Sequence, residues 1–269
     1  MEYTYNEKND VWGFPQIYKG IEFHPIKLTD SLAEKLFYKI FCYPKDYIKE
    51  KEIIKLSYLK YVLYYIPLAT KKEVYEAKEN IENFFKRICK TDNVSLEVKK
   101  LDFIKNEIDS ILISVKINDI SFNEENFDVL REIILKQNGF SLRYIEEYDP
   151  SLEEKLNWVN RKTDGVTFED QLLTFCALSK IPVCDDSIKN ITIYQFKKSF
   201  QRLALLLEYE NLFPLEVSGQ IKSKTGKEIV KHYMSHIGQE GRYDSILISK
   251  DEFMNNHPLM KENNLKNEK

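Results

Sequence analysis

The stretch that decides how the chain begins to fold is Trp12-Gly13-Phe14-Pro15-Gln16-Ile17-Tyr18-Lys19-Gly20-Ile21-Glu22-Phe23-His24-Pro25-Ile26-Lys27-Leu28. Apolar residues lie on both sides of Lys19-Gly20, and glycine accepts the positive φ angle that a tight hairpin turn requires. Pro15 and Pro25 end the two short strands, because proline has no backbone N–H to donate to a ladder. We therefore predict an N-terminal β-hairpin that leads into a helix near Thr29-Asp30-Ser31.

Helical patterns follow the hairpin. Ser31 and Glu34 have the spacing of a capping box, so we predict a helix that begins at Ser31 and ends before Pro44. The apolar residues between Lys49 and Ile66 nearly encircle a second expected helix, which indicates burial on most sides. A third expected helix, from about Lys71 to Lys90, has one apolar stripe.

The pattern then changes to that of strands. Turn residues at Thr91-Asp92-Asn93 introduce two β-rich runs, Ser95 to Ile104 and Ser110 to Ile117, and the second run alternates apolar with polar residues. A helix from about Asn123 to Asn138 follows and stops at Gly139. These patterns predict an α+β, mainly helical fold with an N-terminal hairpin, a helical body and a small inserted antiparallel sheet.

The C-terminal part is expected to be helical. Thr192 caps the longest amphipathic run, from Ile193 to about Tyr209. Polar turn residues from Lys162 to Gly165 separate it from the N-terminal part. We predict an N-terminal region at residues 1–162, a C-terminal helical region at 163–254 and a flexible tail at 255–269.

The composition is that of a globular protein. Of the 269 residues, 43% are hydrophobic and 31% are charged, and a net charge of −3 gives no overall attraction to nucleic acid or an anionic membrane. The 17 tyrosines and 16 phenylalanines are expected mainly in the core, with contact surfaces as the alternative.

The cysteines and the start of the chain indicate an intracellular protein. None of the cysteines forms a Cys-x-x-Cys pair, so we expect reduced core residues in a cytosol. Residues 1–10 are polar, so no signal peptide is expected, and no apolar run is long enough for a bilayer. The four cysteines are Cys42, Cys89, Cys176 and Cys184.

The sequence motifs that suggest catalysis or metal binding each lack a required member. His232 and His236 are four residues apart and could share a helix face, but no third metal ligand lies near them in the sequence. The glycines and lysines around Lys222 to Lys227 do not have the spacing of a phosphate-binding loop. We therefore assign no catalytic, cofactor-binding or metal-binding residue and expect packed histidines and a basic surface loop.

Two places are expected to contact a partner. The hairpin presents Tyr18, Ile21 and Phe23 on a short edge, and open strand edges invite pairing by another chain. Lys197 and Lys198 begin the most basic segment, which continues to Lys231. Because no nucleic-acid-binding motif accompanies these lysines, we expect them to contact an acidic protein surface; nucleic acid is the alternative.

Three segments carry a resemblance to a known group of proteins: residues 18–27, Ile191-Thr192-Ile193-Tyr194-Gln195-Phe196 and His232-Tyr233-Met234-Ser235-His236-Ile237. They resemble the tail assembly chaperones and baseplate-hub assembly proteins of long-tailed bacteriophages. The resemblance implies a non-enzymatic virion-assembly protein in the host bacterial cytoplasm or the virion, without cofactor or membrane. Its partner would be a phage tail or baseplate component, such as the tape-measure protein or a hub subunit. The alternatives are a nucleic-acid-binding regulator and an enzyme whose site is built from dispersed residues.

Overall fold

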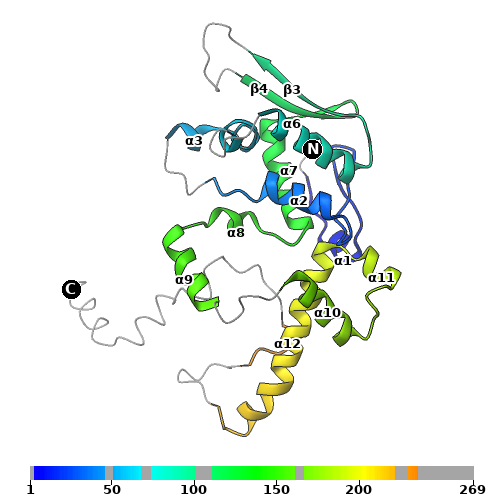
Figure 1. The fold of residues 1–269 in the computed structure, drawn as a ribbon, viewed down its shortest axis with the longest axis vertical. Coiled ribbons are helices and arrows are strands. Elements are labelled where there is room, and N and C mark those ends of the chain that lie inside the picture. Colours follow the sequence, from blue (N-terminus) through cyan, green and yellow to red (C-terminus); the bar gives the residue numbers. More distant parts are fainter. Residues whose placement is uncertain are drawn as a thin grey trace, which may run out of the picture.

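The structure is a computed structural model that describes residues 3–45, 51–67, 74–100, 111–160, 167–221 and 230–235. The fold is α+β and mainly helical, as predicted, with strands at one end and the long helix α12 extending from the other (Figure 1). The strands are β1 (Gln16–Tyr18), β2 (Ile21–Phe23), β3 (Val94–Lys100), β4 (Ile111–Ile117) and β5 (Ile120–Asn123). The helices of the N-terminal part are α1 (Glu7–Trp12), α2 (Ser31–Phe41), α3 (Lys51–Lys55), α4 (Tyr58–Lys60), the π-helix η1 (Tyr61–Tyr65), α6 (Val74–Cys89), α7 (Glu124–Gln137), α8 (Leu142–Glu146) and α9 (Pro150–Asn160). The C-terminal helices are α10 (Phe168–Ser179), α11 (Asp186–Asn190) and α12 (Ile193–Val217).

The N-terminal hairpin forms as predicted. β1 pairs antiparallel with β2, and Ile17 lies opposite Glu22. Lys19 and Gly20 have φ angles of 51° and 80°, and positive φ at both central residues is the pattern of a type I′ turn. The turn that was read from Lys19-Gly20 therefore sets the register of the hairpin.

A short helix that the sequence analysis missed, α1, precedes the hairpin. Its Asp10 is buried and accepts hydrogen bonds from the Tyr5 hydroxyl at 2.6 Å and from Gln16 Nε2 at 2.9 Å. Burial is the main cause that raises the pKa of Asp10, against these two bonds. Gly13 ends the helix with a φ of 70°. This polar network fixes α1 against the first strand.

The inserted antiparallel sheet is confirmed, with one strand more than was predicted. β4 pairs with both β3 and β5, so it is the central strand. Ile113, Val115 and Ile117 of β4 are buried, and the residues between them are more exposed, as the alternation predicted. The sequence analysis did not predict β5, whose four residues end at Asn123, which is also the N-cap of α7.

The α2 helix begins at Ser31 and ends before Pro44 as predicted, but its cap differs, and the prediction of one continuous helix from 49 to 66 was wrong. The N-cap of α2 is Asp30, whose side chain accepts from the Ala33 N–H, and not a capping box of Ser31 and Glu34. The expected helix from 49 to 66 is broken at Ser57, which caps α4, and it continues as the π-helix η1. Residues 46–50 lie outside the described part. Apolar periodicity alone did not show this break, because the apolar residues on both sides of Ser57, Leu56 and Tyr58, are buried.

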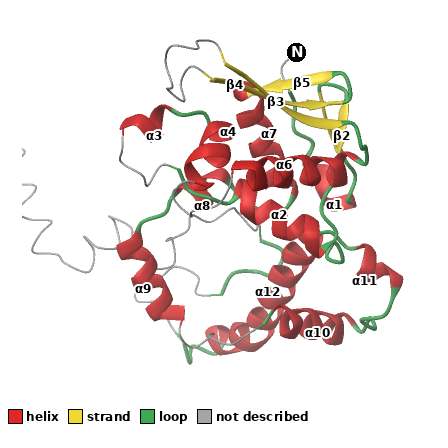
Figure 2. Cartoon of the chain, turned by 45° about the horizontal axis from the view of Figure 1, so that its top comes forward, coloured by secondary structure: helices red, strands yellow, loops and turns green. Residues whose placement is uncertain are grey.

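The main core lies between the three-stranded sheet, the hairpin and α2, α6 and α7 (Figure 2). Aromatic rings fill its centre, and Phe41 lies within 6.0 Å of the Phe84 and Phe127 ring centroids. The bulky side chains that are fully buried there include Phe23, Phe37, Phe41, Phe84, Phe85, Phe122 and Phe127. Many of the aromatic residues therefore serve the core, as we expected.

A second, smaller core joins the C-terminal helices. It contains Phe175, Cys176, Ile188 and Phe196, and Leu28 packs against both cores. α12 has the predicted N-cap Thr192, but it extends beyond the expected end at Tyr209, with Pro214 inside the helix. The start of α12 is bonded to the chain after the hairpin, since the Ile193 N–H donates to the Ile26 carbonyl at 2.9 Å.

The expected boundary between residues 162 and 163 and the tail at 255–269 lie outside the described part, so the division into regions stays a prediction. The expectation that all four cysteines are core residues needs a correction. Cys176 is buried, Cys42 and Cys89 are partly exposed, and Cys184 is exposed in the turn before α11. In the part of the chain that the structure describes, no helix has both the length and the apolar character needed to span a bilayer.

Candidate functional site

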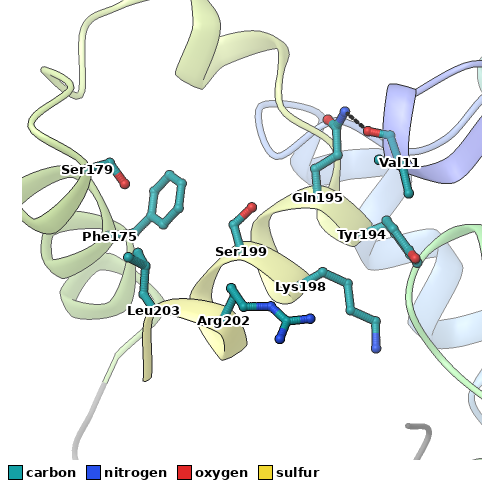
Figure 3. A pocket seen from close by; sticks show the side chains of 9 residues that line it. All are labelled: Val11, Phe175, Ser179, Tyr194, Gln195, Lys198, Ser199, Arg202 and Leu203. Carbon is teal, nitrogen blue, oxygen red and sulfur yellow. Dashed lines mark hydrogen bonds between the residues drawn. The ribbon is translucent and has the colours of Figure 1, made fainter. Parts of the chain in front are cut away.

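A pocket lies along the first turns of α12, between this helix, α10 and the end of α1 (Figure 3). Its volume is about 630 Å³, which is in the range of pockets that bind small molecules or side chains of a partner. We call it the α12 pocket. It is lined by Val11, Phe175, Ser179, Tyr194, Gln195, Lys198, Ser199, Arg202 and Leu203.

The spacing of the α12 lining residues in the sequence puts several of them on one face of the helix. Tyr194, Lys198 and Arg202 are four residues apart, so they share one face of the helix. Figure 3 shows Lys198 and Arg202 projecting from the same side of α12. The capping box of Thr192 and Gln195 fixes where the helix begins and therefore where this face lies.

Gln195 also connects α12 to α1. Its Oε1 accepts the Thr192 N–H, and its Nε2 donates to the Val11 carbonyl at 2.9 Å. Gly13 allows this close approach, because a Cβ atom there would lie 3.3 Å from both the Thr192 and the Gln195 side chains. The end of α1 is thus held as one wall of the α12 pocket.

The opposite wall is apolar. Phe175 of α10 is buried and meets Phe196 edge to face, with ring centroids 5.4 Å apart. Leu203 packs against the same small core. Val11, in contrast, is 57% exposed on the α1 side. The pocket therefore combines a fixed apolar wall with an apolar side chain that is open to solvent.

Lys198 and Arg202 give the pocket a positive charge. Arg202 donates to the carbonyls of Tyr233 and Ser235, the second at 2.8 Å, so its guanidinium holds residues 230–235 against α12. Partial burial, with Arg202 nearby, lowers the pKa of Lys198 from its usual value. Within the described residues no hydrogen bond or ion pair engages the Lys198 ammonium, which leaves it available to an incoming carboxylate.

The structure separates Lys197 from Lys198. The Lys197 ammonium lies 3.1 Å from the centroid of the Phe140 ring, on the side of α12 that faces the N-terminal part. Burial lowers the pKa of Lys197 to about 8. Of the two lysines that we predicted to contact a partner, only Lys198 lines the α12 pocket.

The hairpin residues of the predicted contact lie in the core. Phe23 is fully buried, and Tyr18 and Ile21 are 7% and 8% exposed. Their side chains point inward because they alternate with the exposed residues Ile17 and Glu22. The assumption that these three side chains form an open apolar surface is therefore corrected. A contact through the hairpin stays a prediction, and it would have to use the exposed face.

The histidine and glycine motifs lie largely outside the described residues. His236 and residues 222–229 are not described. His232 lies in a turn, and its Nδ1 accepts the Met234 N–H at 3.1 Å. Over the described ranges, no three His, Cys, Asp or Glu side chains gather in an arrangement that could hold a metal ion.

Sequence reasoning missed the lining residues from α1 and α10. The apolar pair Val11-Trp12 after a polar segment was a usable signal, and both side chains are exposed. The contact between the end of α1 and α12 could not be predicted from the sequence, since Val11 and Gln195 are 184 positions apart.

One comparison with known proteins concerns the part of the chain that builds this pocket. Residues 159–238 match the family described as the YomV second domain. No curated protein and no solved structure matches the chain. The match includes all of α10, α11 and α12. The C-terminal helices are thus similar to the YomV second domain, and because that family name is phage-derived, the match favours a phage protein.

Proposed function

We propose that this chain is a phage protein that assists virion assembly by binding a tail or baseplate component, without catalysing a reaction. The phage-derived family of residues 159–238 supports the phage part of this proposal. The resemblance of three segments to tail assembly chaperones and baseplate-hub proteins suggests the kind of partner. The protein would act in the host cytoplasm or remain in the virion.

The observation that carries the proposal is the composition of the α12 pocket. Phe175 and Leu203 offer an apolar wall, and Lys198 offers an ammonium group at the same opening. Binding sites on protein surfaces commonly combine an apolar centre with a charged rim, and a pocket that takes one anchoring side chain often dominates the affinity. The pocket is therefore suited to an apolar side chain that is followed or preceded by a carboxylate.

The charges favour an acidic partner. Lys198 and Arg202 are adjacent on one helix face, and neither has a carboxylate partner among the described residues. A carboxylate that reaches Lys198 would also reduce the repulsion between the two cations. We expect the partner segment to carry Asp or Glu next to a Leu, Phe or Met side chain.

Affinity purification of the full chain from cells that produce the encoding phage tests this proposal. We expect mass spectrometry to identify a tail or baseplate protein in the captured material. The Lys198→Glu variant should capture at least about tenfold less of this protein, because a reversed charge repels the acidic segment. The Ser199→Trp variant should lose it as well, because the indole would fill the pocket.

Lys155→Glu is the matched control, since Lys155 is an exposed lysine on α9. Circular dichroism and size-exclusion chromatography should show that all three variants are folded. Capture of a tail or baseplate protein that is equal in all variants would show that the α12 pocket is not the binding surface. Capture without any phage structural protein would contradict the assembly function itself.

A further inference from the structure

A second pocket lies at the start of α12 and has a different character. It is about 270 Å³ in volume and shares only Gln195 with the α12 pocket. We call it the Arg87 pocket. Its walls come from the end of α1, the chain after β2, the end of α6 and the residues before α12, so it exists only in the folded chain.

Cationic side chains from separate segments converge on this pocket. Lys27, Arg87 and Lys90 line it together with His24, and Asp30 is the one carboxylate among its lining residues. The whole chain has a net charge of −3, so composition alone does not lead to such a gathering. Three permanent positive charges against one negative charge leave the pocket an excess of two.

Among the described residues, only one of the three permanent cations of this pocket is paired with a carboxylate. Arg87 donates to both Asp30 oxygens at 3.0 and 3.1 Å, and Lys27 Nζ donates to Asn190 Oδ1 at 2.7 Å. Lys90 is exposed, and no described side chain forms an ion pair with it. Lys27 has only a neutral partner and Lys90 has no carboxylate, so both can contact an anion without losing an ion pair.

The cations of the pocket lie close enough to His24 to affect its pKa. Burial is the main cause that lowers the pKa of His24, and the Lys90 ammonium lowers it further, with Glu22 opposing. A neutral imidazole can donate one hydrogen bond and accept another. His24 therefore adds a hydrogen-bonding group to the wall without adding a permanent charge.

Trp12 forms an aromatic wall of the same pocket. Its side chain is 69% exposed, at the C-terminal end of α1. An exposed aromatic ring gives a planar group a face on which to stack, and clustered cations attract a phosphate that is attached to that group. The volume of the pocket suits one phosphate group with a small substituent, and not a long polymer.

We propose that the Arg87 pocket binds the phosphate group of a small molecule, with Lys27, Lys90 and Arg87 contacting the phosphate oxygens and Trp12 flanking them. Arg87 bonds both Asp30 oxygens through Nη1, so its Nε and Nη2 groups can donate to phosphate oxygens while the pair with Asp30 is kept. This site is separate from the α12 pocket and does not depend on the proposed assembly function. Free phosphate and a phosphorylated nucleoside are two sources of the same chemistry.

The fluorescence of Trp12 gives a direct assay. The chain has two tryptophans, Trp12 and Trp158, so the Trp158→Phe variant reports on Trp12 alone. The full chain would be titrated with inorganic phosphate and with adenosine monophosphate at low ionic strength, and calorimetry would measure the same binding independently. We expect saturable binding of at least one ligand. Tighter binding of adenosine monophosphate would identify a phosphorylated organic molecule, and equal binding would identify free phosphate.

The charge-reversed variant Lys27→Glu/Lys90→Glu should bind at least about tenfold more weakly, because charged hydrogen bonds of this kind contribute at least that much. Lys180→Glu is the matched control, since Lys180 is also exposed and has a φ of 56°, close to the 51° of Lys90. Lys90→Gln serves as a milder variant if the double variant does not fold. Absence of binding by both methods, or equal affinity in the charge variants, would overturn the proposal. So would tighter binding of a single-stranded oligonucleotide than of either small ligand.

Discussion

Replacing Lys197 by methionine should stabilise the folded chain at neutral pH and lose this advantage at high pH. Burial lowers the pKa of Lys197 from 10.5 to about 8, and at 1.36 kcal/mol per pH unit this corresponds to a cost of about 3 kcal/mol for holding the charge. Removing the contact of the side chain with the Phe140 ring, which the Lys197 nitrogen approaches to 3.1 Å, costs the variant about 2 kcal/mol in either protonation state of the lysine. Methionine keeps most of the packing volume, so Lys197→Met should gain about 1 kcal/mol near pH 7.

The lowered pKa of Lys197 determines whether the stability difference between the two proteins rises or falls with pH. Because the pKa of Lys197 is lower in the folded state, the unfolded state binds more protons above about pH 8, and the wild-type protein gains stability relative to the variant as the pH rises. Between about pH 7 and about pH 9.5 this gain is about 2 kcal/mol. The variant should therefore be about 1 kcal/mol less stable than the wild-type protein at the upper pH.

Urea denaturation followed by circular dichroism at several pH values measures this difference. Other titrating groups are common to both proteins and largely cancel in the comparison. Lys155→Met, at an exposed position on α9, should change the free energy of unfolding by less than about 0.5 kcal/mol. A difference between Lys197→Met and the wild-type protein that stays constant within about 0.5 kcal/mol from pH 7 to 9.5 would refute the argument. It would mean that the Phe140 ring keeps the ammonium charged throughout.

Two further predictions concern the two places that were expected to contact a partner. Phe23→Ala should destabilise the fold by about 3 to 5 kcal/mol, because it leaves a cavity in the main core. Ile17→Ala, on the exposed face of the hairpin, should cost less than about 1 kcal/mol. Thermal unfolding measures both variants, and equal losses of stability would contradict the burial pattern. The chain should show no submicromolar affinity for DNA or RNA at about 150 mM salt. A tight complex that is abolished by Lys198→Glu would favour the nucleic-acid-binding alternative.

Local rules predicted the parts of the fold that depend on neighbours in the sequence. Lys19-Gly20 specified the hairpin turn, Thr192 specified the start of α12, and alternation specified β4. The rules failed where two residues compete for one role. Asp30 and Ser31 are both good N-caps, and the Asp30 carboxylate also bonds Arg87, 57 positions away, so tertiary contact favours Asp30.

The candidate site was only partly predictable for the same reason. The cationic face of α12 was visible in the sequence, but the walls that turn it into a pocket come from Val11 and Phe175. Gln195 makes the connection to Val11, and nothing local distinguishes this glutamine from one that serves the capping box alone. Periodicity indicates which face of a helix is polar, whereas a pocket requires knowledge of what packs beside that face.

Lys197 and Lys198 show that charged residues adjacent in the sequence need not form one charged surface. Consecutive residues of a helix point about 100° apart, so two adjacent lysines leave the helix in different directions. In this chain the first lysine lies over Phe140 and helps to hold α12 against the N-terminal part, while the second lines the α12 pocket. Changing both together, as a sequence-based test would, mixes a change in stability with a change in binding. Lys197→Met and Lys198→Glu separate them, because the first should alter the free energy of unfolding and the second the capture of a partner.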